Sequence, residues 1–185
     1  MKGTVLEAFW VFNPRKYFAM NDNLQGAEAL KKIKEMVESI DFCMLTTLDA
    51  GNRMSARPMG TQEVEDDGTI WFFTDEQQFG AQSADGDIVL LSYASPAKQS
   101  YLTINGVAFL VQDGAKMKEL WNDTLKAWFP QGLDTPGIAL LRVQPDSAHY
   151  WDADASRVMM VAQYVYAKAT GDYKNLVGKS GELDV

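Results

Sequence analysis

Residues 41–75 read DFCMLTTLDAGNRMSARPMGTQEVEDDGTIWFFTD, and this stretch decides the fold. It holds three segments rich in apolar, aromatic and β-branched residues, 41–49, 53–65 and 69–75, separated by the turn sequences AGN and EDDG. Short segments of this kind joined by such turns are typical of antiparallel hairpins. The stretch therefore predicts three consecutive antiparallel strands.

The same pattern continues further along the chain. DIVLLSYAS (87–95) and SYLTINGVAFLVQ (100–112) predict another hairpin, in which Gly106 marks a bulge or bend. GIALLRVQPDSAHYWD (137–152) predicts a strand pair or one long bent strand. Because strands follow strands through short turns, the sheet should be mainly antiparallel. A small closed or half-closed barrel fits this order better than a doubly wound parallel sheet.

Helices are expected between and beside these strands. Residues 24–40 are apolar at helical spacing and predict an amphipathic helix. Asp113 is placed to cap a helix over 114–129, on which Trp121 and Trp128, seven residues apart, would share one face. That face would pack in the core or a dimer, or form a wall over a ligand. Residues 155–171 predict a closing helix.

The length of 185 residues suggests one domain with appendages. We expect an N-terminal arm over 1–23, the barrel domain over 24–172, and a polar, mobile C-terminal tail over 173–185. The GKS sequence within this tail lacks the spacing of a phosphate-binding loop, and the chain has no G-x-G-x-x-G motif.

Composition excludes several classes of function. A net charge of -8 and a pI near 4.6 argue against a nucleic-acid or anionic-membrane partner, and no apolar run is long enough to span a membrane. The chain has one cysteine, Cys43, and one histidine, His149, which are too few for the usual metal sites, so we expect no metal. A single cysteine and no signal-peptide cleavage pattern fit a cytoplasmic protein. Cys43 is expected to be a small buried residue and His149 a structural one.

Four segments together resemble one family: CMLTTLDAGNRMSARPMG (43–60), IWFFTD (70–75), VLLSYASPAKQSYLTINGVAFL (89–110) and the stretch from KELW to HYWD (118–152). The chain is similar to the general stress protein 26 group of the pyridoxamine 5'-phosphate oxidase-like, FMN-binding split-barrel superfamily. The resemblance implies a mainly β fold with flanking helices, built on a six-stranded antiparallel split barrel. It also implies an obligate homodimer with FMN, or FAD, in a groove at the interface.

The resemblance implies where a flavin would bind. Proline within a strand lacks a ladder donor, so the strand carrying Arg57 should open at that point. The end of IWFFTD would line the flavin ring through backbone groups, with Thr74 towards the phosphate. The candidate flavin-binding residues are Arg57, Pro58, Met59, Phe72, Phe73, Thr74, Asp75, Lys98, Gln99 and Trp128.

The chain departs from the family pattern at the residues that would bind the flavin phosphate. Family members usually carry a lysine a few residues after FFT, where this chain reads EQQFGAQSADG without Lys or Arg. They often have Arg-Ser before RPM, where this chain has Ser55 and Ala56. Three cations remain as candidates, Arg57, Arg53 and Lys98, with help from Gln78, Gln82 or backbone N–H groups. Between residues 51 and 111 the sequence has these three basic residues and eight acidic residues.

Three functions stay open on this basis. The first is a flavin-dependent oxidoreductase acting with a small-molecule redox partner, because a flavin needs no protein acid or base. Pyridoxamine-phosphate oxidation itself is not expected, since a second phosphate site would need more cations. The second is a flavin-binding or sensing module without turnover, acting in a stress response. The third is a barrel that has lost flavin and binds a protein partner or another planar ligand, such as haem or a deazaflavin.

Overall fold

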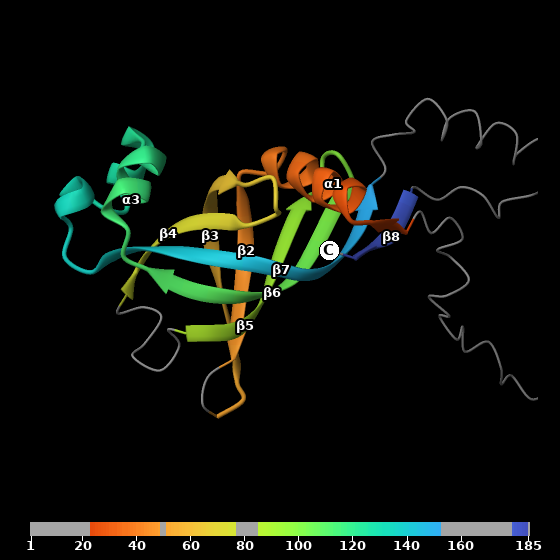
Figure 1. The fold of residues 1–185 in the computed structure, drawn as a ribbon, viewed down its shortest axis with the longest axis horizontal. Helices are drawn as coiled ribbons and strands as arrows, with labels where there is room; N and C mark the ends of the chain where they lie inside the picture. Colours follow the sequence, from red (N-terminus) through yellow and green to blue (C-terminus); the bar gives the residue numbers. More distant parts are fainter. Residues whose placement is uncertain (1–22, 49–50, 77–84, 153–178, 185) are drawn as a thin grey trace, which may run out of the picture.

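A computed structural model describes residues 23–48, 51–76, 85–152 and 179–184 of the chain. In these residues the apolar segments form strands that wind into a barrel (Figure 1). The strands are β1 (Leu24–Gln25), β2 (Phe42–Leu48), β3 (Met54–Val64), β4 (Ile70–Asp75), β5 (Asp85–Ser95), β6 (Ser100–Val111), β7 (Ile138–Asp152) and β8 (Lys179–Asp184). The helices are α1 (Ala27–Glu38) and α3 (Gly114–Leu120), with short 3₁₀ turns η2 (Asp123–Ala127) and η3 (Gly132–Asp134).

Six strands close the barrel. They follow the order β7-β4-β3-β2-β5-β6, and β6 pairs back onto β7. Every neighbouring pair in this ring is antiparallel. The prediction of a mainly β, six-stranded antiparallel barrel with flanking helices is confirmed.

Alternation along β2 shows why these segments form strands. Cys43, Leu45 and Thr47 are buried, whereas Phe42, Met44 and Leu48 on the opposite face are exposed. The inward residues join one apolar core, together with the inner faces of the other strands and of α1. A second, smaller core lies outside the barrel, between β4 and β7 and the segment containing α3.

The closing pair β6–β7 contains the predicted irregularity at Gly106. The register shifts between Asn105 and Gly106, and a Cβ atom on Gly106 would lie 2.5 Å from the carbonyl oxygen of Gln144. Only glycine permits this approach of two backbones. The segment after Gly137 is one long strand that pairs with β4 through its first half and with β8 through its second.

Helix α1 begins later than its periodicity predicts. Leu24 and Gln25 form the short strand β1 beside β8, and Gly26 turns the chain with a φ of 56° before the helix begins. The apolar face of α1 is buried against the barrel, with Ile33 fully inaccessible. In Figure 1 helix α1 lies above the barrel and α3 at its left, and both helices form ion pairs with the β3–β4 turn region, Lys34 with Asp66 and Lys116 with Glu65.

The prediction of one helix over residues 114–129 is wrong in its length. Asp113 caps α3 as expected, accepting hydrogen bonds from two backbone N–H groups, but the helix ends at Leu120. Trp121 is extended and packs edge-on against Phe73, with ring centroids 5.6 Å apart. Asn122 then caps η2. Trp121 and Trp128 therefore do not share a helix face.

The expectation of a mobile polar tail over residues 173–185 is also wrong for its last part. Lys179–Asp184 form β8, which pairs with β7 and with β1. Leu183 lies opposite Ala148 and is 1% exposed, so the strand contributes to the main core. Residues 1–22 of the predicted arm and the predicted helix over 155–171 lie outside the described residues.

Candidate functional site

The barrel is split between β3 and β4. The two strands pair at Thr61 with Phe72, shift register at a bulge, and continue through Glu63 with Trp71 and Val64 with Ile70. In the described residues this pairing ends where the predicted flavin segments Arg57–Met59 and Phe73–Asp75 lie. The structure thus brings these two segments to the same opening of the barrel.

Arg57, Pro58 and Met59 face different sides of β3. Arg57 is half-buried and lies opposite Leu45, on the side of the barrel interior. Met59 is buried in the main core. Pro58 is exposed and lies opposite Met44 on the outer face. Arg57 is the residue of this segment that offers a charge at the opening.

Side chains at the end of β4 are more buried than expected for residues predicted to line a binding surface. Phe72 is inaccessible in the main core, and Phe73 belongs to the outer core beneath Trp121. Thr74 is 4% exposed, and Asp75 is half-buried. This segment can therefore present backbone groups at the opening, while its side chains hold the strand in place.

Lys98 and Gln99 lie in the turn between β5 and β6, away from Arg57 in the same chain. Leu45 of β2 pairs with Arg57 on one side and with Leu91 of β5 on the other, so these three residues lie in one row across the sheet. The turn begins after Ser95, four residues further along β5 than Leu91. Four residues of strand span roughly 13 Å. Lys98 is exposed, and Gln99 has a φ of 53°. Within one chain the structure does not bring these residues to the opening.

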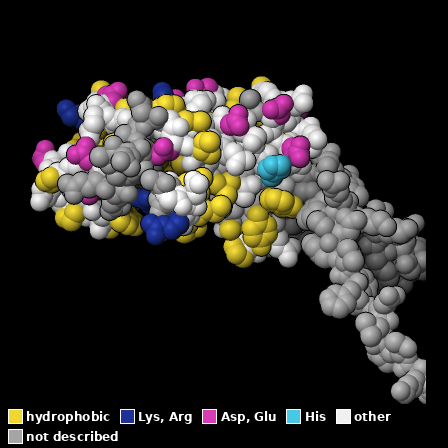
Figure 2. All heavy atoms as spheres, turned by 90° about the horizontal axis from the view of Figure 1, so that it is seen from below, with side chains coloured by type: hydrophobic (Ala, Val, Ile, Leu, Met, Phe, Trp, Pro, Cys, Tyr) yellow, Lys and Arg dark blue, Asp and Glu magenta, His cyan; other side chains and the backbone are white. Residues whose placement is uncertain are grey.

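An apolar strip covers the outer face of β2 and its neighbours. Phe42 and Trp128 pack together with ring centroids 6.3 Å apart, and Met44 beside Pro58 extends the strip along β2. The strip's large exposed members are Phe42, Met44, Leu48, Met54, Ile88 and Trp128. Figure 2 shows apolar side chains gathered on the face it presents, with a group of basic side chains beside them.

Sequence reasoning missed most of this strip, although a signal was present. In FCMLTTL both alternating positions carry apolar residues, so a strand with one face in the core must expose the others. Ile88 is 73% exposed and Met54 is 78% exposed. Exposed patches of this kind mark interaction or ligand surfaces. The strip and the opening meet at Pro58.

These residues fit the ring of a flavin better than its phosphate. Exposed apolar side chains and strand backbone suit a flat ring with polar edges. For a dianionic phosphate, the candidates are the half-buried Arg57 of β3 and the exposed Arg53 just before that strand. The predicted helpers Gln78 and Gln82 lie outside the described residues.

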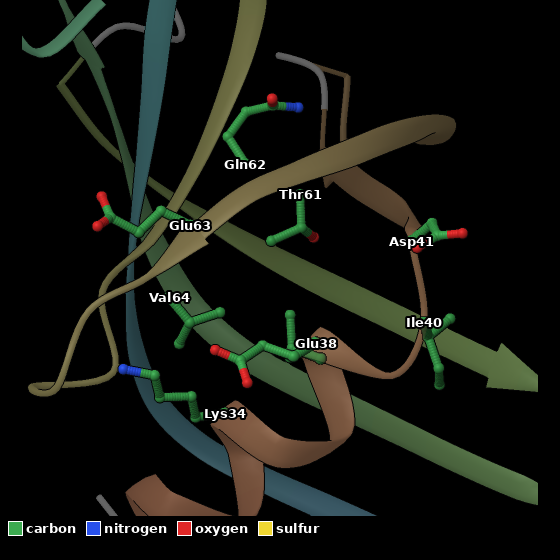
Figure 3. A pocket seen from close by; sticks show the side chains of 9 residues that line it. Lys34, Glu38, Ile40, Asp41, Thr61, Gln62, Glu63 and Val64 are labelled. Atoms are coloured by element: carbon green, nitrogen blue, oxygen red, sulfur yellow. The ribbon is translucent and has the colours of Figure 1, made fainter. Parts of the chain in front are cut away.

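A separate hollow of about 390 Å³ lies between α1 and β3 (Figure 3). Lys34 and Glu38 line it on the side of α1, and Thr61, Gln62 and Glu63 line it on the side of β3 (Figure 3). Its charged groups are partly engaged elsewhere, because Lys34 donates to Asp66 at 2.8 Å and Glu63 accepts from Lys116. None of the predicted flavin residues lines this hollow.

Cys43 is buried in the main core, as expected, with 2% of its surface exposed. Burial raises the pKa of the Cys43 thiol to about 12, and a hydrogen bond from Tyr93 offsets only part of the rise. Burial likewise raises the pKa of Tyr93, whose hydroxyl shares a 2.9 Å hydrogen bond with that of Thr61. The protonated thiol therefore acts as a packing group.

Raising the pH should destabilise the protein partly through Cys43. The unfolded thiol loses its proton near pH 9, whereas the folded thiol keeps it until about pH 12. The stabilisation is thus complete below pH 9 and is lost above it, with a slope approaching ~1.4 kcal/mol per pH unit. Urea unfolding across this range should show a shallower slope for Cys43→Ser, which keeps a hydroxyl near Tyr93. Equal slopes in both proteins would contradict the assignment.

The described residues contain no helix long and apolar enough to cross a membrane. They also contain no group of three or more His, Cys, Asp and Glu side chains placed to hold a metal ion. His149 is half-buried in β7 between Thr103 and Glu182 on the neighbouring strands.

Comparison with known proteins supplies an independent line of evidence. A profile of the family described as pyridoxamine 5'-phosphate oxidase like matches residues 28–175. The general stress FMN/FAD binding protein from Xanthomonas citri is 32% identical, with a TM-score of 0.61 over 71% of this chain and 93% of that chain. A structure assigned as general stress protein 26 from Jannaschia sp. CCS1 is 19% identical, with a TM-score of 0.69 over 86% and 100% of the two chains. Protein bli-3 of Neurospora crassa is 22% identical in an alignment of 170 positions that covers 86% of this chain and 81% of that protein.

Proposed function

Because the chain belongs to the pyridoxamine 5'-phosphate oxidase-like family, we propose that it binds a flavin, FMN in the first place, and uses it in an oxidoreductase reaction. One observation carries the proposal: the β3–β4 pairing ends between the two segments that the family resemblance assigns to the flavin. The similarity to a general stress FMN/FAD binding protein supports it.

The chain's own residues would hold and shield the flavin. Arg57 would bind the phosphate, backbone groups of Phe73–Asp75 would hydrogen-bond the ring edge, and Pro58 with Met44 would form an apolar wall. A bound flavin supplies hydride or single-electron transfer at its N5 atom. The protein's part is orientation and exclusion of water, and no side-chain acid or base is required of it.

Flavin binding can be tested directly on the purified full chain. FMN, FAD and riboflavin are added separately, free ligand is removed by desalting, and absorbance is read at about 450 nm, where oxidised flavins absorb. We expect FMN to be retained at one per chain. Retention of no flavin would refute the proposal. Deazaflavin and haem, tested in parallel, cover the alternative planar ligands.

We further propose that the protein is a homodimer whose interface is the apolar strip. Five large apolar side chains exposed on the neighbouring strands β2, β3 and β5, together with Trp128 after η2, have the character of a covered surface. Because Pro58 and Met44 belong both to this surface and to the flavin wall, dimer formation would complete the flavin site.

Met44→Lys is therefore expected to convert the dimer to monomer and to release the flavin together with it. Met44 is 43% exposed, so the substitution costs little folding stability, but it places an unpaired ammonium in an apolar interface. Light scattering after gel filtration and absorbance of the eluted peak measure both effects. Ala115→Lys, on exposed α3, adds the same charge away from the strip and should leave the dimer intact. Flavin retained on a stable Met44→Lys monomer would contradict the interface model.

A second function, a flavin-binding module without turnover, is favoured by the scarcity of cations. Arg57 and Arg53 are the cations near the opening among the described residues, and residues 77–84 contain no Lys or Arg. Stable flavin binding without reduction by NADH or NADPH, and without transfer to an added acceptor, would support this function over the oxidoreductase. For either function we propose the cytoplasm, where a single buried thiol stays reduced.

A further inference from the structure

A row of side chains on the outer face of the barrel contains two buried nitrogens without a hydrogen-bond acceptor. Trp71 of β4 pairs directly with Arg142 of β7, and Arg142 pairs with Phe109 of β6. The Nε1 atom of Trp71 and the Nε atom of Arg142 are both buried and find no partner in the described structure. Cβ atoms of directly paired antiparallel residues lie about 5 Å apart. The two side chains therefore start from neighbouring positions on one face of the sheet.

Unpartnered buried donors of this kind are costly and rare. Leaving a buried N–H without an acceptor destabilises the folded protein, and more so when the group is charged. Trp71 is 8% exposed, so solvent reaches its indole only slightly. Arg142 is half-buried, and its guanidinium lies over the ring of Phe109 at 4.8 Å. No carboxylate is paired with Arg142 among the described residues.

Of the two cations near Trp71, Lys116 and Arg142, we take Arg142 as the one that can bind an anion. Lys116 lies over the Trp71 ring at 5.6 Å, but its ammonium is bound by Glu63, Glu65 and Glu119 at 2.5–3.4 Å. Glu63 is paired with Trp71 on the side away from Arg142. A guanidinium stacked on an aromatic ring keeps its N–H edge open to a planar or tetrahedral oxyanion.

We propose that Trp71 and Arg142 form a binding site for a small oxyanion, a carboxylate or a phosphate. Arg142 supplies charge and a hydrogen-bonding edge, and the indole N–H of Trp71 supplies a second donor. Phe109 and Lys116 hold these two side chains in position. The site lies on the outer face of β4, β7 and β6, whereas the proposed flavin opening lies between β3 and the Phe73–Asp75 end of β4. The oxyanion site therefore goes beyond the proposed function and does not depend on it.

The test follows the indole N–H signals in ¹H–¹⁵N spectra of the full chain, with Trp71 assigned by its loss in Trp71→Phe. Benzoate and inorganic phosphate are titrated separately at low ionic strength, with and without saturating FMN. We expect a saturable shift of the Trp71 signal that FMN does not abolish. The probe that binds more tightly identifies the class of ligand, carboxylate or phosphate.

Substitutions test whether Arg142 binds the probe anion. Arg142→Gln should weaken binding of the probe by roughly 10- to 100-fold, and Arg142→Lys should fall between it and the wild type. Lys118→Gln removes the same charge from exposed α3 and should bind as the wild type does. Trp71→Phe, followed by calorimetry, should bind more weakly. Absence of saturable binding by either probe, or equal binding by Arg142→Gln with an unchanged fold by circular dichroism, would overturn the proposal.

Discussion

Arg57→Ala should raise the dissociation constant for FMN by about 10- to 100-fold while changing that for riboflavin by less than about threefold. Arg57 is the half-buried cation beside the opening between β3 and β4. We propose that it binds the phosphate, which riboflavin lacks. Charge-assisted hydrogen bonds to a partly desolvated phosphate are the strongest contacts available at such a site. Fluorescence titration with both flavins measures the difference.

Lys98→Ala is the matched comparison, because it removes the same charge from the turn between β5 and β6. Within one chain Lys98 lies away from Arg57, so loss of FMN affinity in this variant would require Lys98 of the partner subunit. Unchanged affinity would exclude Lys98 as the replacement for the missing family lysine. An equal loss of FMN and riboflavin in Arg57→Ala would show that Arg57 supports the fold rather than the phosphate.

Phe72→Ala should lower the free energy of unfolding by about 3–5 kcal/mol. Phe72 is fully inaccessible in the main core, at the point where β4 pairs with both β3 and β7. Removing its ring leaves a cavity that strands fixed on both sides cannot close. Urea unfolding at a fixed protein concentration measures the loss, since the stability of the proposed dimer would depend on concentration.

Phe42→Ala is the control for this measurement. Phe42 is 51% exposed on the outer strip, so its removal should cost less than about 1 kcal/mol while weakening the proposed dimer. Comparable losses of stability in the two variants would contradict the placement of Phe72 in the core. Phe72 was predicted as a flavin-lining residue, and its side chain would now influence flavin binding through the fold.

Strands and hairpins could be predicted because their signals are local. The alternation of side chains in β2 and the turn EDDG between β3 and β4 act over a few residues, and the structure has all three strands where they were expected. The helix cap at Asp113 could be predicted for the same reason, because it also depends on neighbouring residues. The length of that helix could not be read in this way, because Asn122 starts a new cap and Trp121 leaves the helix to pack on Phe73.

The candidate site was predicted in part. Local sequence placed Arg57–Met59 and Phe73–Asp75 on strands, and the tertiary structure brought them to one opening. It also separated Lys98 and Gln99 from that opening, and it buried Thr74. These outcomes depend on register between strands, which a single segment does not contain.

By itself, then, the sequence determined the strands, their antiparallel succession and the family. Only the tertiary structure decided where the barrel splits, which apolar side chains stay exposed on the outer strip, and that Lys179–Asp184 form a strand beside β7. The physical reason is the range of the interactions. Alternation and turns act between near neighbours, whereas closure of β6 on β7 and addition of β8 pair residues far apart in the chain, whose complementarity appears only once the barrel has formed.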